Sequence, residues 1–82
     1  MTELEKTLYD LCLPLADDKD NLSVKQMSSV NENEILLYVY ASSDDTARLI
    51  GRKGAMASAL RQMMSIAARN DSKRVNVKFE AY

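Results

Sequence analysis

The chain of 82 residues contains only two glycines, which stand three positions apart, at Gly51 and Gly54. The two residues between them, Arg52 and Lys53, are both basic. Glycine is used where the backbone must adopt a positive φ or approach another group closely. Because helical patterns stand on both sides of this pair, the sequence predicts a tight turn that joins two helices.

The first helix is predicted from a capping pattern and an apolar stripe. Thr2 and Glu5 have the spacing of a capping box at its start. The apolar residues that recur at helical spacings are Leu4, Leu8, Leu11, Cys12 and Leu15. Pro14 removes a helical hydrogen bond, so regular helix should end within 11–13, with one loose turn beyond. Cys12 is expected in the core rather than as a reactive thiol, since no basic neighbour would stabilise a thiolate.

Two strands are predicted to follow and to pair as a hairpin. The first, over 22–30, is weakly patterned, whereas 35–41 is an apolar run rich in β-forming residues. Polar residues 31–34 supply the turn. Alternation places two sets of side chains on opposite faces of the second strand: Ile35, Leu37, Val39 and Ala41, and then Leu36, Tyr38 and Tyr40. The first set is expected to face the core, because tyrosine can keep its hydroxyl in water.

Two helices are predicted around the glycine pair. Ser42 or Ser43 caps a short helix over 44–49. A longer helix runs over 55–69, and Asn70 suits the left-handed position that ends it. Apolar residues cover about 200° of the wheel of this helix. That arc is wider than one packing surface needs, so the helix is expected to contact the sheet and also another helix or a second chain.

The last segment has the clearest strand pattern, because Val75, Val77 and Phe79 alternate with polar residues. The element order is therefore helix, strand, strand, short helix, helix, strand. We expect residues 1–82 to form one α+β domain.

Composition excludes several classes of protein. The longest apolar run, 35–41, is far shorter than the roughly 20 residues of a membrane-spanning helix, and the start shows no secretory pattern. The single cysteine cannot form an intramolecular disulfide. The absence of histidine excludes Ser-His and Cys-His catalysis, and a metal site would need an unusual ligand set. These features predict a cytoplasmic protein without a membrane partner, a metal site or a cofactor.

Three carboxylate pairs remain as candidates for catalysis: Asp17 with Asp18, Glu32 with Glu34, and Asp44 with Asp45. All lie in polar stretches, and we interpret them as solvated, because a catalytic carboxylate usually needs burial to shift its pKa. No residue is therefore assigned as catalytic, and neither an enzyme nor a small-molecule substrate is predicted.

Charge is divided unevenly along the chain. The net charge is −1 overall, but ten acids and three bases give residues 1–45 a net charge of −7. Eight bases and two acids give residues 46–82 a net charge of +6. Either the second half carries a site for an acidic partner, or the fold brings the halves together and neutralises them.

The glycine turn has two interpretations. It is a structural turn with solvated basic residues, or it is a site where a sugar-phosphate backbone approaches the helix that follows. In the second case, Arg52 and Lys53 supply charge beside the N–H groups that open that helix.

The run Leu49-Ile50-Gly51-Arg52-Lys53-Gly54, placed between two helices in this element order, resembles the type II KH domain. With Ala57, Ala59-Leu60-Arg61 and residues 73–77, the chain more closely resembles the small stand-alone bacterial KH proteins of the KhpA family. The resemblance covers nearly the full length. It implies a three-stranded sheet with helices packed on one face, and a GxxG loop that clamps about four nucleotides of single-stranded RNA.

Carried over to this sequence, the resemblance implies RNA contacts at Arg48, Ile50, Gly51, Arg52, Lys53, Gly54, Ala55 and Ser58. Ile50 would anchor the loop to the core, and Arg48 would contact a phosphate. Ala55 and Ser58 stand where relatives often carry a basic residue, which predicts weaker binding, partly compensated by Arg61. The bases are expected in a groove floored by apolar residues near Ile50, Met56 and the second strand.

The resemblance further implies a cytoplasmic RNA-binding protein, proposed as an RNA chaperone. Such a protein forms a homodimer or pairs with a larger KH-containing protein of the KhpB (Jag) type. In some bacteria that pair is linked to cell elongation and peptidoglycan homeostasis.

A second hypothesis is a protein assembly module whose RNA contact is made mainly by its partner. The apolar arc of the long helix, at Met56, Met63 and Ile66, would form the interface. The tyrosines of the outer sheet face would be exposed or would face a partner chain, or would stack on bases.

Overall fold

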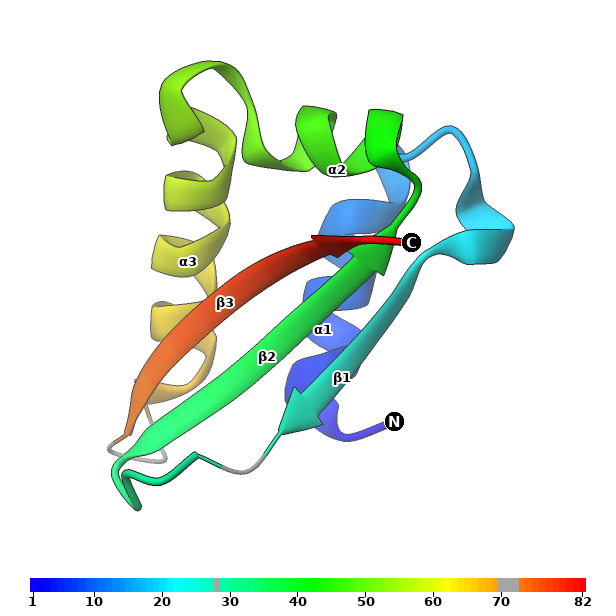
Figure 1. Cartoon of the computed structure of the whole chain (residues 1–82). Coiled ribbons are helices and arrows are strands. Elements are labelled where there is room, and N and C mark those ends of the chain that lie inside the picture. Colours follow the sequence, from blue (N-terminus) through cyan, green and yellow to red (C-terminus); the bar gives the residue numbers. More distant parts are fainter. Residues whose placement is uncertain (28, 70–72) are drawn as a thin grey trace.

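Three strands form one mixed sheet in the order β1-β2-β3 (Figure 1). The computed structural model describes residues 1–27, 29–69 and 73–82. β1 spans Ser23–Met27, β2 spans Glu34–Ala41 and β3 spans Arg74–Ala81. β1 pairs with β2 in antiparallel orientation, which confirms the predicted hairpin, and β3 pairs with β2 in parallel. β2 is therefore the central strand, and β3 leaves one of its edges unpaired within the sheet.

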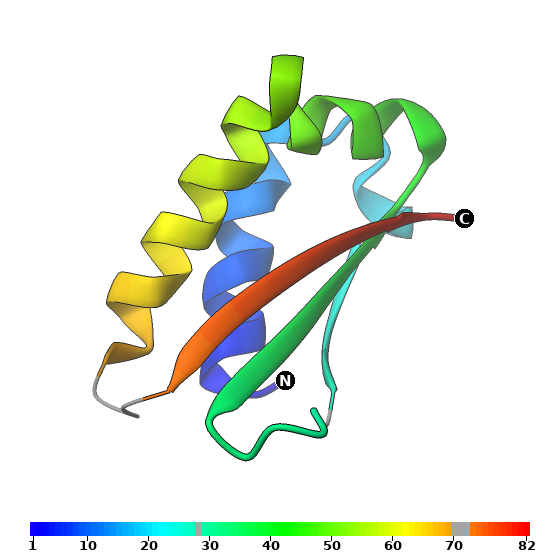
Figure 2. The same ribbon diagram turned by 60° about the vertical axis from the view of Figure 1, so that its left-hand side comes forward.

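Three α-helices pack against one face of this sheet, as the resemblance implied (Figures 1 and 2). α1 spans Glu3–Cys12, α2 spans Ser43–Ile50 and α3 spans Ala55–Ala67. Short 3₁₀ segments follow α1 and connect α2 to α3. No helix among the described residues is long and apolar enough to cross a membrane.

The core lies between the helices and the predicted inner face of β2. Side chains of β2 alternate strictly: Ile35, Leu37, Val39 and Ala41 are buried, whereas Leu36, Tyr38 and Tyr40 are half-buried on the open face. Cys12 is fully buried, and burial raises the pKa of its thiol to about 12. Both the choice of core face and the core position of Cys12 are thereby confirmed.

The start and end of α1 also follow the prediction. The Thr2 side chain accepts a hydrogen bond from the Glu5 backbone at 3.1 Å, and the Glu5 carboxylate accepts one from the Thr2 backbone at 2.6 Å. Glu5 also accepts from the backbone of Gln26 at 2.7 Å, so the capping box attaches α1 to β1. α1 ends at Cys12, and a 3₁₀ turn that contains Pro14 follows it.

Several boundaries differ from the sequence patterns. β1 ends at Met27, well short of the predicted 22–30, whereas β3 is longer than its alternating core because it pairs with the whole of β2. α3 ends at Ala67 rather than at residue 69, since Ala68 has left helical geometry at φ −98° and ψ 4°. The predicted cap at Asn70 lies outside the described residues.

Candidate nucleic-acid interface

The segment between α2 and α3 is a tight turn built from left-handed backbone. Gly51 has φ 75°, Lys53 has φ 56° and Gly54 has φ 77°. The turn is closed by a hydrogen bond of 3.2 Å from the Gly54 N–H to the Gly51 carbonyl oxygen. Of the two uses of glycine that the sequence left open, both glycines show the positive φ, and Gly51 also approaches another residue closely. The positive φ of Lys53 is an uncommon conformation for a residue with a Cβ.

The two glycines meet different constraints. A Cβ on Gly51 would lie 2.8 Å from the Cβ of Met56 and 2.9 Å from its backbone nitrogen. A Cβ on Gly54 would meet nothing within 4 Å. Packing within the protein therefore requires glycine at position 51, whereas the space beside position 54 is open to a ligand.

Positive potential is concentrated at this turn. Gly54 is the N-cap of α3, and the Ala55 N–H donates to the Arg52 carbonyl oxygen. No described side chain accepts from the N–H groups that follow, and the first turn of α3 contains no acid. Arg52 and Lys53 are exposed beside it. Unpaired N–H groups and the helix dipole favour an anion at such an end.

A groove of about 370 Å³ runs from this turn along the edge of β3. Its lining residues are Ile50, Gly54, Ala57, Arg61 and residues 76–80. The strand that forms one wall is therefore β3, whereas the second strand was expected there from the sequence. The other expected floor residue, Met56, is half-buried and packs against the core.

Ile50 lies on the surface rather than anchoring the loop. It is 36% exposed and lines the groove, whereas the preceding Leu49 is fully buried in the core. The expectation that Ile50 anchors the loop to the core was wrong, because only one of two consecutive apolar residues at this helix end points inward.

Arg61 and the backbone of β3 form the polar part of the groove. The Nε of Arg61 donates a hydrogen bond to the Val77 carbonyl oxygen at 3.3 Å. The N–H groups of Arg74 and Tyr82 donate to the β2 side, at Asn33 and Ala41. Because backbone direction alternates along a strand, the odd-numbered residues of β3 direct their N–H and C=O groups to the free edge. That edge faces the groove.

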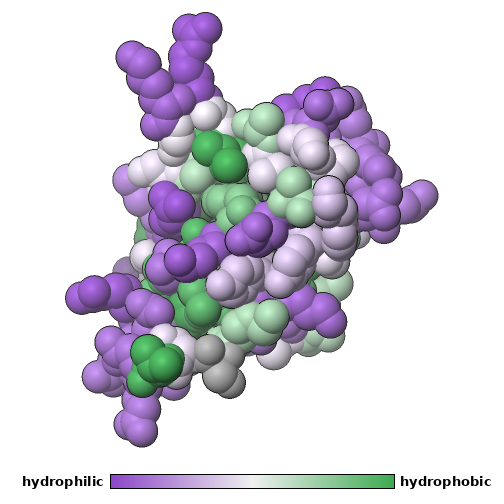
Figure 3. Space-filling model, viewed as in Figure 1, coloured by the Kyte–Doolittle hydropathy of each residue, from purple (hydrophilic) through white to green (hydrophobic). Residues whose placement is uncertain are grey.

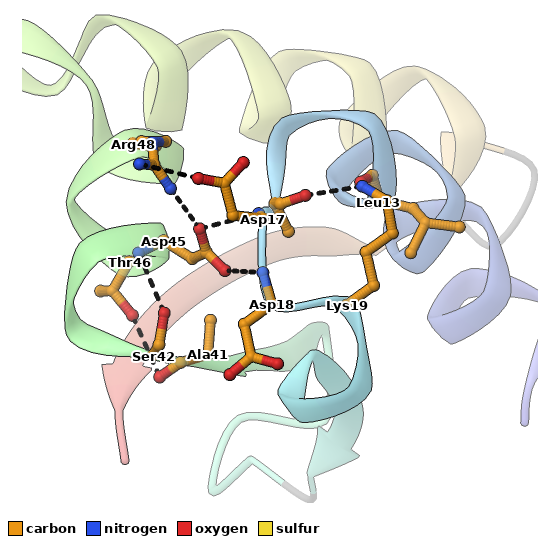
Figure 4. A network of polar contacts seen from close by, with 10 residues as sticks. Leu13, Asp17, Asp18, Lys19, Ala41, Ser42, Asp45, Thr46 and Arg48 are labelled. Atoms are coloured by element: carbon orange, nitrogen blue, oxygen red, sulfur yellow. Dashed lines mark hydrogen bonds and ion pairs between the residues drawn. The ribbon is translucent and has the colours of Figure 1, made fainter.

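Arg48 is engaged in a polar network between α2 and the segment that follows α1 (Figure 4). Its guanidinium contacts Asp45 at 2.6 Å and Asp17 at 3.0 Å. The Asp45 carboxylate also accepts hydrogen bonds from the backbone N–H groups of Asp17, at 2.9 Å, and Asp18, at 2.8 Å. The structure thus places Arg48 among acidic groups of the first half of the chain and of its own helix.

The role of Asp45 was not predicted from the sequence. Its polar stretch indicated a solvated carboxylate, but its side chain is only 1% exposed. The backbone N–H groups of Asp17 and Asp18, and then Arg48, hold the pKa of the Asp45 carboxyl below its ordinary value. The sequence shows only that Asp45 stands three residues after the helix cap Ser42. It does not show the backbone partners of the Asp45 carboxylate, because these lie 27 and 28 positions earlier in the chain.

The remaining predicted site residues divide into exposed and half-buried positions. Ala55 and Ser58 are exposed on the first turns of α3. On the same helix, Met63 is 49% exposed and Ile66 is 67% exposed, so two of the three predicted interface residues are accessible. Within residues 1–27, 29–69 and 73–82, no group of three or more Cys, Asp or Glu side chains is placed to hold a metal ion.

Comparison with known proteins agrees with this arrangement. Residues 5–79 match the family model described as KhpA/KhpB, KH domain. The RNA-binding protein KhpA of Clostridium acetobutylicum is 28% identical over 75 residues, which cover 92% of this chain and 97% of that protein. The match of the family model includes the turn, β1, β2, most of β3 and most of the groove lining, and the chain therefore belongs to the KhpA/KhpB family of KH domains.

Proposed function

We propose that this protein binds single-stranded RNA through the turn Gly51–Gly54 and the groove beside β3. The observation that carries the proposal is the open space at Gly54, between exposed basic side chains and the N-terminus of α3. The similarity to a protein named as RNA-binding supports RNA as the ligand.

The turn supplies the phosphate contacts. The absence of a Cβ at Gly54 lets a phosphate approach the first N–H groups of α3, which form hydrogen bonds with anions. Arg52 and Lys53 stand on the exposed side of the turn and add positive charge. These contacts are independent of base sequence, so they fix the position of the strand in the groove.

The groove supplies the base contacts. Ile50, Ala57 and Phe79 give it apolar surface, against which the face of a base can pack. The free edge of β3 presents backbone donors and acceptors beside that surface, and these groups can pair with the polar edge of a base. An RNA strand in the groove therefore contacts the cations of the turn on one side and the backbone groups of β3 on the other.

The test is RNA binding by a charge-reversal variant of the turn. Arg52→Asp/Lys53→Asp keeps both glycines, so the turn geometry survives. The matched control is Lys73→Asp/Arg74→Asp, which changes the same residue types by the same charge at exposed positions near the start of β3. Fluorescence anisotropy with a pool of short labelled RNAs, at one fixed salt concentration, gives the affinity.

We expect the turn variant to lose about tenfold or more in affinity and the control to lose much less. Thermal melts must show that both variants are folded. Equal losses in the two variants would mean that binding follows net charge alone, and that the turn is not the site.

A second candidate function is assembly through α3. Met63 and Ile66 are exposed, stand three positions apart and therefore share one face of the helix. Such a face suits a second copy of this chain or a KhpB-type partner. Light scattering at two concentrations tests self-association: Met63→Asp/Ile66→Asp should lower the mass at the higher concentration, whereas the control Ser65→Asp should not.

A further inference from the structure

The open face of the sheet carries a row of stacked aromatic rings. The rings of Tyr38 and Tyr40 have centroids 6.0 Å apart and an interplanar angle of 16°. The ring of Tyr82 continues the row, with its centroid 6.0 Å from that of Tyr40 and an angle of 28°. We name Tyr38, Tyr40 and Tyr82 the tyrosine ladder. The helices pack on the other face of the sheet (Figures 1 and 2), so the ladder lies on the uncovered one.

Lysines flank the ladder on both neighbouring strands. Lys25 on β1 and Lys78 on β3 are both in register with Tyr38. Both lysines are exposed, and neither forms an ion pair with a described residue. Negative charge also reaches this face, since Glu80 is in register with Tyr40. Positive charge is thus concentrated at the Tyr38 level of the ladder.

The ladder is continuous with the proposed RNA groove. The residues of β3 that line the groove include Asn76, Lys78 and Glu80, whose side chains belong to the open face. The groove therefore extends around the edge strand, and the ladder begins on the next strand, about 4.8 Å away. Lys78 lies between the two surfaces and contributes to both.

The character of the open face favours RNA over a protein partner. Figure 3 views this face and shows hydrophobic residues interrupted by hydrophilic ones across the sheet. A protein interface would usually deplete lysine at its centre. Tyrosine rings flanked by lysines instead provide the two elements of single-stranded nucleic-acid binding, which are stacking surfaces for bases and cations for phosphates.

We propose that a single-stranded RNA held in the groove continues around β3 and stacks one or two further bases on the tyrosine ladder, with Lys25 and Lys78 contacting its phosphates. This inference rests on the proposed function, because the groove determines where the strand reaches β3. It assigns the protein a binding site longer than the four or so nucleotides that a GxxG clamp alone holds.

The experiment compares unstructured RNAs of four and twelve nucleotides. The ladder variant is Tyr38→Leu/Tyr40→Leu, which removes the rings but keeps apolar side chains on the strand. The control is Tyr38→Phe/Tyr40→Phe, which keeps the rings and removes only the hydroxyls. We expect the leucine variant to lose about tenfold in affinity for the longer RNA and nothing for the shorter one, and the phenylalanine variant to retain both affinities.

Tyrosine fluorescence of the unmodified protein gives a second measurement that does not depend on the folding of any variant. The chain has no tryptophan and four tyrosines, three of which form the ladder. Stacked bases quench a tyrosine, so the longer RNA should quench most of the emission at saturation and the shorter one little of it. Equal quenching by both lengths, or none by either, would overturn the ladder as a binding surface.

The outcomes separate this inference from the proposed function. If Arg52→Asp/Lys53→Asp abolishes binding of both lengths and the leucine variant changes neither, the turn binds RNA and the ladder inference is wrong. If the leucine variant loses the longer RNA while the turn variant binds normally, the ladder stands and the proposed turn site is wrong. If the leucine variant keeps its RNA affinity but loses self-association, the open face is a protein interface and the inference is overturned.

Discussion

Arg48 and Arg52 stand four residues apart, yet their surroundings are opposite. Arg48 lies in the last turn of α2 and contacts the carboxylates of Asp45 and Asp17. Arg52 lies in the turn that follows, exposed beside open space at Gly54. The basic second half of the chain therefore serves two purposes. Arg48 neutralises acids that the fold brings together, whereas the basic residues of the turn remain available to a ligand.

The two regions also differ in how their backbone groups are satisfied. In the Asp45 network, a buried carboxylate accepts hydrogen bonds from two backbone N–H groups and an arginine. At the start of α3, the Ala55 N–H donates to the Arg52 carbonyl oxygen, and no described side chain accepts from the N–H groups that follow. A satisfied network stabilises the fold, whereas unpaired donors beside basic residues favour an external anion.

Removing the charge of Asp45 should have the largest effect on stability. Asp45→Asn replaces one acceptor oxygen by a donor group, which then faces the N–H of Asp17 or Asp18 or the guanidinium of Arg48. We expect the melting temperature to fall by about 10 °C or more, measured by circular dichroism. RNA affinity measured well below the melting temperature should stay within about twofold of the unmodified protein. A large loss of affinity in the folded variant would show that the network also positions the turn.

The two glycines should respond differently to alanine. Gly51→Ala places a Cβ 2.8 Å from Met56 at a positive φ, so we expect the melting temperature to fall by about 10 °C. Gly54→Ala meets no neighbour within 4 Å, so only its positive φ of 77° strains the backbone. A smaller fall of about 5 °C is expected, with roughly tenfold weaker RNA binding, because the new Cβ occupies the space beside the turn.

Differential scanning calorimetry measures the loss of stability in each glycine variant, and fluorescence anisotropy measures the loss of RNA affinity. The prediction fails if Gly54→Ala binds RNA normally, because the open space beside position 54 would then not be where the strand lies. The substitution Gly54→Asn controls for backbone strain, since asparagine tolerates the left-handed region better than alanine.

The pH dependence of stability tests the same network through protonation. The pKa of the Asp45 carboxyl is lowered by its hydrogen bonds to the backbone of Asp17 and Asp18, from an ordinary value of 3.8. A folded pKa below the unfolded value contributes stability that is fully present above about pH 4 to 5 and is lost as the pH falls through the folded pKa. The melting temperature of the unmodified protein should therefore exceed that of Asp45→Asn by less as the pH falls from about 5 to 3, in thermal melts at constant ionic strength. A difference in melting temperature that stays unchanged down to about pH 3 would contradict the lowered pKa of Asp45.

Local patterns in the sequence predicted the parts of the fold that depend on near neighbours. The capping box of Thr2 and Glu5, the inward face of β2 and the tight turn at the two glycines all follow from residue type and spacing. The position of Asp45 does not, because its carboxylate is satisfied by backbone groups 27 and 28 positions earlier. No local pattern indicates that those N–H groups lie beside α2.

The groove shows the same distinction at the candidate site. The sequence predicted the turn, but it placed the second strand at the floor of the groove. The wall is β3, which reaches the turn only because it pairs in parallel with β2 and so forms the edge of the sheet beside α3. Strand order is a long-range property, and alternation in Val75, Val77 and Phe79 predicts the strand without predicting its neighbours.

The smallest expected effect compares the two arginines directly. Arg48→Gln and Arg52→Gln make the same chemical change and leave the same net charge. Arg52→Gln should weaken RNA binding by a few fold and reduce the slope of log affinity against log salt by about 0.7, because one phosphate contact is lost. Arg48→Gln should leave affinity and slope unchanged and lower the melting temperature by a few degrees, since its carboxylate partners lose a cation. If both variants reduce the slope equally, Arg48 leaves its acidic partners and contacts a phosphate when RNA binds, as the family resemblance implies. The division of roles between the two arginines would then hold only for the protein without RNA.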